Sequence, residues 1–405
     1  MARLGIDFGT SNTACAWLDA GRPQVIALEP GRATLPSAVF LDFDSRDMLI
    51  GHAAQAAMME GREGRFLRAL KSVLGTALAR EKRQLMNERI TLIEVIARFL
   101  AEIRRRAEAA TGQRFETALS GRPVRFHSAS LERHEQALAD LTEAYRLAGF
   151  DAVDFLPEPE AAALATGGEG RILIVDIGGG TSDFTLCDRH DGETRVLAST
   201  GLRLGGTDFD KWLSLAHAMP LLGHGAEIGN EFGEGTHTAP KALFNDLASW
   251  EKIAFVYGAA TLREVRRWER LSPQPHLFAR LGEVLESHLG HEVAYAVEAA
   301  KIEANGASAG MIELGMIERG LKAELAHGAL QAELHEAARQ IAGCALQAVA
   351  EAGAAPGTVD RVVFVGGSSL LGAVQAQLRA GFPGAAFETS EVFTAVVDGL
   401  ARAAG

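Results

Sequence analysis

One turn pattern occurs twice in the chain and constrains its fold more than any other feature of the sequence. Asp7-Phe8-Gly9-Thr10-Ser11-Asn12 follows an apolar strand pattern at the N-terminus, and Asp176-Ile177-Gly178-Gly179-Gly180-Thr181-Ser182-Asp183 follows a second one near the middle. Each turn joins the first two strands of a predicted three-strand meander. A strand, turn and strand unit repeated once in each half predicts two similar lobes that face a shared cleft.

The first lobe is predicted over residues 1–170. Its meander is followed by helical periodicity over residues 45–112, which we expect to be a helical insertion. A helix is predicted over residues 131–148, and Pro157-Glu158-Pro159 then turns the chain into an alanine-rich helix.

The second lobe is predicted over residues 171–405. Its meander is followed by a mixed helical insertion over residues 211–292, whose glycine-rich part, residues 223–235, is typical of a mobile loop. A long helix over residues 316–352 and a buried strand over residues 361–365 are expected to complete the lobe.

Composition excludes several classes of function. With 405 residues, 47% of them apolar, the chain can build two domains with substantial cores. A net charge of -12 argues against nucleic acid as a partner, because phosphate backbones demand a positive field. No apolar run approaches the roughly 18 residues of a membrane helix, so we expect no membrane partner and a cytoplasmic location. The cysteines lie far apart and without histidines at metal spacing, and are expected to be buried apolar residues: Cys15, Cys187 and Cys344.

The two turns have the chemistry of a phosphate clamp. Glycine lets the main chain approach a phosphate closely, so Gly9-Thr10-Ser11 and Gly178-Gly179-Gly180-Thr181 are candidates to hold a triphosphate from opposite sides. Asp7 and Asp176 end their strands and would hold a hydrated magnesium ion, which takes few carboxylates and keeps several waters. The sequence therefore predicts a nucleoside triphosphate with Mg²⁺ as the ligand.

Five motifs occur in order along the chain: GIDFGTSNT (5–13), EPEAAAL (158–164), IVDIGGGTSDF (174–184), GGTDFD (205–210) and VVFVGGSS (362–369). Together they resemble the phosphate, connecting and adenosine motifs of the DnaK-type heat-shock chaperones, within the actin and hexokinase superfamily. The resemblance implies an α/β actin-like ATPase fold, in which two lobes of a duplicated ribonuclease H-like motif surround a nucleotide cleft and each carries an inserted subdomain. It also implies ATP or ADP and Mg²⁺ as ligands.

The resemblance also implies roles for individual residues. Asp7 and Asp176 would surround the magnesium, Thr10 and Thr181 would contact phosphates, and Glu158 would orient the attacking water.

Residues 66–75 resemble the family segment whose lysine reaches the γ-phosphate, which makes Lys71 a catalytic candidate beside Glu158, Asp176 and Thr181. The alternative for Lys71 is a solvated lysine on a helix.

Glu298 and Lys301 are three residues apart and would share one helix face, where the family holds the ribose hydroxyls. A surface ion pair between them is the alternative. The remaining candidate nucleotide contacts come from the motifs or lie near this pair: Gly9, Ser11, Asn12, Gly178, Gly179, Gly180, Asp183, Gly205, Gly206, Asn305, Gly366, Gly367 and Ser368.

The sequence departs from the family pattern in two places. Ile302 and Leu370 stand where the family usually places two arginines around the adenine, which removes a cation–π component of roughly 0.5–2 kcal/mol and weakens the preference for adenine. Residues 392–404 resemble the closing helix of the ATPase domain, so the sequence given predicts no peptide-binding domain and resembles short members of the family.

The sequence leaves four functions open. The first is a chaperone-like ATPase with an unknown client or partner protein, and the second is a filament-forming actin relative. The third is a small-molecule kinase of the same superfamily. The fourth is a nucleotide-dependent binding module with negligible hydrolysis, which would act as a switch through lobe closure.

Overall fold

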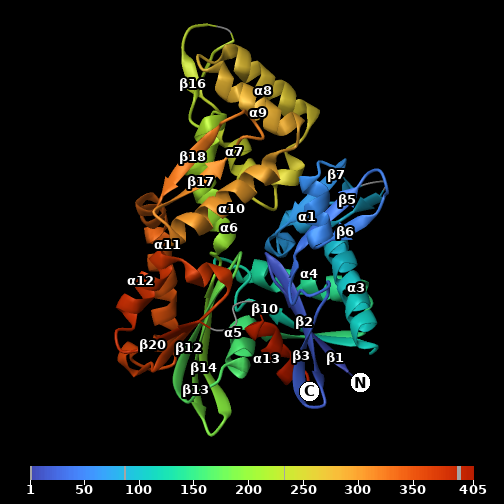
Figure 1. The fold of residues 1–405 in the computed structure, drawn as a ribbon, viewed down its shortest axis with the longest axis vertical. Helices are drawn as coiled ribbons and strands as arrows, with labels where there is room; N and C mark the ends of the chain where they lie inside the picture. The colour runs from blue at the N-terminus through green and yellow to red at the C-terminus, as the bar shows by residue number, and fades with distance from the viewer. Residues whose placement is uncertain (1, 86–87, 232, 390–393) are drawn as a thin grey trace. The chain divides into compact units, whose positions relative to one another are not determined.

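The computed structural model describes residues 2–85, 88–231, 233–389 and 394–405. These residues form two compact units. The first unit combines Met1–Gly206 with Glu336–Gly405, and the second is Thr207–His335. Both large sheets of the protein belong to the first unit (Figure 1).

The first large sheet has the strand order β11-β10-β1-β2-β3, with β4 paired to β2. β1 is parallel to β10 and β10 to β11, whereas β2 is antiparallel to β1, β3 and β4. The predicted N-terminal meander is therefore confirmed. The strands are β1 (Arg3–Phe8), β2 (Asn12–Asp19), β3 (Arg22–Ile26), β4 (Leu35–Pro36), β10 (Thr117–Arg122) and β11 (Ala152–Pro157).

The second large sheet repeats the order and directions of the first. It runs β14-β13-β12-β19-β20, with β12, β19 and β20 parallel and the β12, β13 and β14 pairs antiparallel. The duplication that the two turns predicted is thus present in the strand topology. The strands are β12 (Gly170–Ile177), β13 (Ser182–His190), β14 (Glu193–Leu202), β19 (Arg361–Val365) and β20 (Ala386–Thr389).

Two helices pack against each other and each covers one of these sheets. α13 (Ala395–Ala403) contacts β1, β2, β3 and β10, while α5 (Glu158–Ala165) contacts β12, β13 and β14. The two helices cross closely because small residues line the crossing: a Cβ on Gly399 would lie 1.7 Å from the carbonyl oxygen of Ala161. Residues 392 and 393 of the predicted closing helix lie outside the described residues.

The insertion over residues 45–112 is not the purely helical one that the periodicity predicted. Short strands alternate with its helices, because the apolar residues of 38–42 and 64–68 pair across a small sheet of order β6-β5-β7. Its elements, with β5 just before it, are β5 (Ala38–Asp42), β6 (Met48–Ile50), α1 (His52–Met59), β7 (Gly64–Arg68), the 3₁₀ turn η1 (Leu70–Val73), α2 (Ala77–Arg80), β8 (Arg83–Leu85), β9 (Glu88–Ile90) and α3 (Leu92–Thr111).

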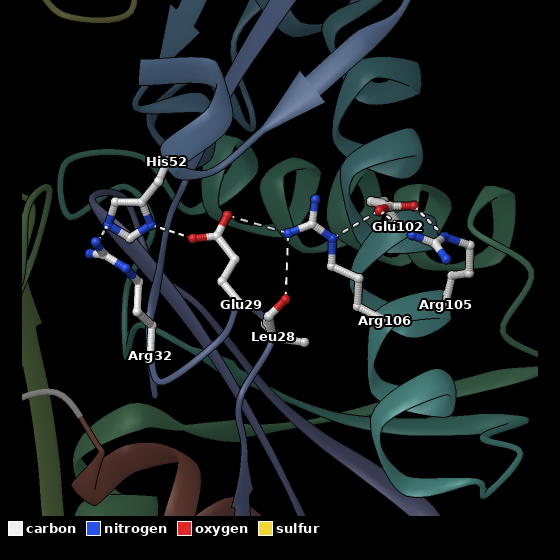
Figure 2. Close-up of polar contacts among 7 residues, drawn as sticks. All are labelled: Leu28, Glu29, Arg32, His52, Glu102, Arg105 and Arg106. Carbon is white, nitrogen blue, oxygen red and sulfur yellow. Dashed lines mark hydrogen bonds and ion pairs between the residues drawn. The ribbon is translucent and has the colours of Figure 1, made fainter. Parts of the chain in front are cut away.

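The arginines of α3 are committed to ion pairs within the protein. Glu29 lies between His52 and Arg106, and Arg106 also bonds Glu102, as Figure 2 shows. Arg105 pairs with the same Glu102 on the helix surface. These ion pairs connect the segment after β3 to α1 and α3. The arginine charges of α3 are therefore paired with carboxylates of the same protein.

Two helices of the first unit end where glycine was expected to stop them. α3 ends at Gly112, whose φ of 68° is left-handed, and Gly149, with φ 90°, follows α4 (Leu131–Leu147). α3 begins with a capping box between Thr91 and Glu94. The other elements near the C-terminus are α11 (His327–Glu351), η5 (Pro356–Thr358), η6 (Gly367–Leu370) and α12 (Gly372–Gly381).

The second unit is mostly helical and corrects two predictions. Part of the glycine-rich stretch 223–235, which was predicted as a mobile loop, forms the first strand of a short hairpin, β15 with β16. Residues 316–326 are not helical either, because residues 322–326 pair as β18 with β17, so the long helix begins only at His327.

The elements of this unit are α6 (Gly206–Leu213), the π-helical turn η2 (Ser214–Ala218), η3 (Met219–Leu222), β15 (Glu227–Gly229), β16 (Thr236–Thr238), α7 (Lys241–Leu247), η4 (Ile253–Phe255), α8 (Ala259–Leu271), α9 (Pro275–Glu286), α10 (Gly290–Gly306), β17 (Ala309–Glu313) and β18 (Lys322–Ala326).

The structure also shows the lengths of the helices and the burial of the cysteines. Among the described residues, each helix is either too short or too polar to cross a bilayer. Cys15 and Cys187 are buried as expected, whereas Cys344 is only partly buried.

Candidate functional site

The two glycine turns have the same internal geometry. The Gly9 amide donates to the carbonyl of Asn12, and the Gly178 amide donates to the carbonyl of Thr181. The nitrogen–oxygen distance is 3.0 Å in both hydrogen bonds. Both turns therefore close in the same way at the ends of β1 and β12. The duplicated turn is a structural repeat as well as a sequence repeat.

The two turns also lie against each other. A Cβ built on Gly179 would come within 2.6 Å of the Ser11 hydroxyl oxygen, and one on Gly180 would lie 3.1 Å from Thr10 Oγ1. A side chain at Gly179 would require Ser11 and Thr10 to move, because the added Cβ would contact both. The first unit thus brings together the two halves of the predicted phosphate clamp.

Buried carboxylates gather beneath the turns. The strand register puts Asp176 directly opposite Asp183, whereas Asp7 faces Ala14 in the first hairpin. Burial, followed by repulsion from Glu158, raises the pKa of Asp7 to about 7. The same two causes raise the pKa of Asp183 to about 7, and that of Asp176 well above its ordinary value.

Lys71 is the cation within this cluster. It lies in η1 with its side chain 7% exposed, and its ammonium donates to Glu158 Oε1. Burial alone would lower the pKa of Lys71, but the charges of Glu158 and Asp7 outweigh burial and raise it. The solvated-lysine alternative is therefore wrong, although the contact of Lys71 with a γ-phosphate remains a prediction.

The local backbone structure positions both Lys71 and Glu158. Ala69, just before η1, adopts a left-handed φ of 58°, which redirects the chain as β7 ends. Glu158 is in the first turn of α5, where the helix dipole favours a negative charge. A Cβ on Gly121 would lie 3.1 Å from Glu158 Cγ, so the glycine in β10 leaves room for the glutamate.

The carboxylate cluster fits a hydrated divalent cation. Asp183 Oδ1 accepts from the Val124 amide at 2.7 Å, but its buried Oδ2 has no hydrogen-bond partner among the described residues. Raised pKa values in a group of acids indicate negative charge that lacks compensation. No three acidic, imidazole or thiol side chains converge as a ready-made metal site in the described part of the chain. Magnesium does not require one, because it keeps several waters and takes one or two carboxylates.

The raised pKa of Asp183 predicts a pH-dependent stability in magnesium-free buffer. Its folded value of about 7 exceeds the ordinary 3.8, so the folded state binds more protons between these values and loses stability as pH rises through them. We expect Asp183→Asn to raise the thermal midpoint at pH 8 by about 3 °C or more, since ~1 kcal/mol corresponds to 2–4 °C in domains of 150–250 residues. At pH 5 the difference should be smaller, and it should nearly vanish only below pH 3.8, where the carboxyl is protonated in both the folded and the unfolded state.

Thermal unfolding monitored by circular dichroism measures this difference. Asp191→Asn is a matched control, because Asp191 is exposed on the β13–β14 turn and has a left-handed φ that asparagine also tolerates. An equal shift at both pH values would contradict the raised pKa of Asp183 that burial and charge repulsion produce.

The later glycine motifs border the same turns. The Gly206 amide donates to the Gly178 carbonyl at 3.0 Å, and a Cβ on Gly205 would lie 2.7 Å from Gly179 main-chain atoms. A Cβ on Gly206 would lie 2.5 Å from Ser368 Oγ. Gly366, which precedes Gly367, follows the last residue of β19 and has a φ of 76°. It lies next to Asp176 Oδ1. The first unit therefore gathers four of the five motifs and Gly205-Gly206 of GGTDFD.

The predicted ribose residues belong to α10 in the second unit. Lys301 is buried, and its ammonium donates to Asp210 Oδ1 at 2.6 Å. Asp210 also accepts from Trp250 Nε1 at 3.1 Å, and burial raises its pKa. Lys301 therefore does not form a surface pair. The ribose roles of Glu298, Lys301 and Asn305 remain predictions.

The two residues that replace the family arginines are large exposed apolar side chains. Ile302 is 65% exposed on α10, and Leu370 is 41% exposed at the end of η6.

Sequence reasoning missed two polar residues of this region. Asp210 was quoted within the GGTDFD motif without a role, although an acid in a buried-helix pattern requires a partner. Arg203 lies just before Gly205-Gly206, and its guanidinium reaches the Ser72 carbonyl at 3.0 Å. An arginine in a loop is not a signal by itself, so only the fold identifies Arg203.

Comparison with known proteins agrees with this geometry. The family model described as Hsp70 protein matches residues 3–220, more than half of the chain. The chaperone protein DnaK of Thermoplasma acidophilum is 36% identical over 218 residues, which cover 51% of this chain and 34% of that protein. The chain thus spans about a third of the length of this relative. The Hsp70 match includes both glycine turns, Lys71 and the carboxylate cluster, and it shows that the chain belongs to the Hsp70 family, with its actin-like ATPase fold.

Proposed function

We propose that this protein binds ATP with Mg²⁺ between its two glycine turns and hydrolyses it slowly, as a chaperone-type nucleotide switch. One observation carries the proposal: a buried Lys71–Glu158 pair lies among three further carboxylates, directly beneath two facing glycine turns. Main-chain amides suit phosphates, and uncompensated carboxylates suit a hydrated cation. The Hsp70 match favours this function over a filament or a sugar kinase.

In this proposal, different residues of the chain have different roles in hydrolysis. Amides and hydroxyls of the turns, including Thr10 and Thr181, hold the phosphates in line for attack. Asp7 and Asp176 would hold the magnesium, which neutralises charge on the phosphate oxygens. Lys71 places a positive charge at the terminal phosphate, and Glu158 orients the attacking water.

Proton transfer completes this mechanism. The water oxygen bonds to the γ-phosphorus as the bond from that phosphorus to the β–γ bridging oxygen breaks, leaving ADP and phosphate. Asp183 Oδ2 is suited to receive the water proton, because it is a buried carboxylate oxygen with no hydrogen-bond partner among the described residues.

Phosphate release from ATP tests the proposal. We expect turnover with Mg²⁺ and ATP, little in excess chelator, and a rise in thermal midpoint on adding MgADP, because a ligand that binds only the folded state stabilises it. GTP serves as the parallel substrate and reports the base preference that Ile302 and Leu370 affect. If neither ATP nor ADP shifts the thermal midpoint or binds in calorimetry, the proposed function is wrong.

The chaperone part of the proposal rests on family membership and the expected closure of two duplicated lobes around nucleotide. A client or partner protein would then respond to the nucleotide state. ATP-dependent pelleting would instead indicate a filament, and turnover that required an added sugar would indicate a kinase.

A further inference from the structure

Arg203 is a cation near the glycine turns whose side-chain hydrogen bonds, among the described residues, go to neutral acceptors. It follows β14, and the residue lines a small cavity of about 20 Å³ together with Lys71, Thr10, Gly180 and Thr181. A cavity of this size holds about one water molecule. The side chain is only partly buried, so it borders both the cavity and solvent.

Neutral acceptors hold the guanidinium in place. Arg203 Nη2 donates to the Ser72 carbonyl at 3.0 Å, and Nη1 lies 3.1 Å from His127 Nδ1. Because arginine only donates, Nδ1 must accept, which leaves the imidazole proton on Nε2 to donate to the Leu74 carbonyl at 2.7 Å. Burial, reinforced by Arg203, lowers the pKa of His127, in agreement with a neutral ring.

The charge of Arg203 is therefore uncompensated, in contrast to that of Lys71. Lys71 is paired with Glu158, whereas no carboxylate pairs with Arg203 among the described residues. Guanidinium carries five donors in a planar fork that matches phosphate oxygens. Two of these donors are anchored by Ser72 and His127, and no further hydrogen bond of the fork is seen among the described residues.

We propose that Arg203 recognises the terminal phosphate of bound nucleoside triphosphate and so distinguishes the triphosphate from the diphosphate. This inference rests on the proposed function, because it requires nucleotide in the turns. The added γ-phosphate would extend toward the cavity shared by Lys71 and Arg203, where a charge-assisted fork contact is stronger than a neutral one. Arg203 joins the end of β14 to η1 and to the segment after β10, so the same contact would report the γ-phosphate to both sheets.

Calorimetric titration with MgADP and with magnesium β,γ-imido-ATP tests this inference without requiring turnover. In Arg203→Met we expect the affinity for the triphosphate analogue to fall about tenfold or more, while the affinity for ADP stays within about twofold. Arg203→Lys keeps the charge without the fork and should fall between these values. Arg195→Met is the control, because Arg195 is exposed on the same strand.

The ratio of the two affinities separates recognition from a structural role. A merely structural role would weaken both ligands alike, and this outcome would overturn the inference, as would an unchanged ratio. If Arg203→Met does not fold, the ratio in Arg203→Lys decides in the same way. If the unaltered protein binds both nucleotides but the ratio does not respond, only this inference fails. If it binds neither, the proposed function fails as well.

Discussion

Lys71→Ala is expected to lower the rate of ATP hydrolysis by about a hundredfold or more, the effect typical of removing one preorganised charge from a transition state. The ammonium is buried and held by Glu158, so its position is fixed before nucleotide arrives. Because magnesium and the glycine turns would still hold the phosphates, MgADP should bind within a few-fold of its normal affinity. Single-turnover phosphate release, with ADP binding measured separately, distinguishes these effects.

The control for this variant must separate chemistry from folding. Removing one partner of a buried ion pair costs about 3–5 kcal/mol, because the other charge is left unpaired. The double variant Lys71→Ala, Glu158→Ala should therefore regain thermal stability without regaining turnover. Lys82→Ala, an exposed lysine of the same insertion, should behave as the unaltered protein. Near-normal turnover in Lys71→Ala would reject the assigned site.

The features that the sequence predicted well are those encoded locally. Alternating apolar residues and a glycine turn define each hairpin, so the meanders and the positions of Asp7 and Asp176 could be placed before the fold was known. Gly112 and Gly149 likewise mark helix ends through their own backbone preference. Repetition of one hairpin then indicated the duplicated topology, because two similar units fold in similar ways.

Non-local contacts decided the parts that could not be predicted. Residues 64–68 and 322–326 form strands because they find partners in β5 and β17, which overrides the helical tendency of their neighbours. The Lys71–Glu158 pair joins residues 87 positions apart, a distance at which spacing carries no information. Lys301 similarly donates to Asp210, 91 positions away, a partner that helical spacing cannot indicate.

Gly399→Ala is expected to be among the most destabilising single-methyl changes in the first unit. The added Cβ would lie 1.7 Å from the Ala161 carbonyl oxygen, which is main chain and has no rotamer by which to retreat, so α5 and α13 must separate. The surrounding core is fully packed with Ala162, Ala395 and Leu400. Overpacking of this kind costs about 1–3 kcal/mol or more, against a gain of only about 0.5–1 kcal/mol in helix propensity.

Gly343→Ala is the matched control, because Gly343 is exposed within α11 and a Cβ there would meet nothing within 4 Å. We expect the midpoint of thermal unfolding to fall by about 4 °C or more in Gly399→Ala and to stay level or rise in Gly343→Ala. A comparable rise of the thermal midpoint in both variants would mean that α5 and α13 cross less closely than a Cβ-to-oxygen distance of 1.7 Å implies. Since α5 carries Glu158 in its first turn, a shifted crossing should also slow ATP hydrolysis in Gly399→Ala at temperatures where the protein remains folded. That loss would connect the packing of the two helices between the sheets to the position of the carboxylate that holds Lys71.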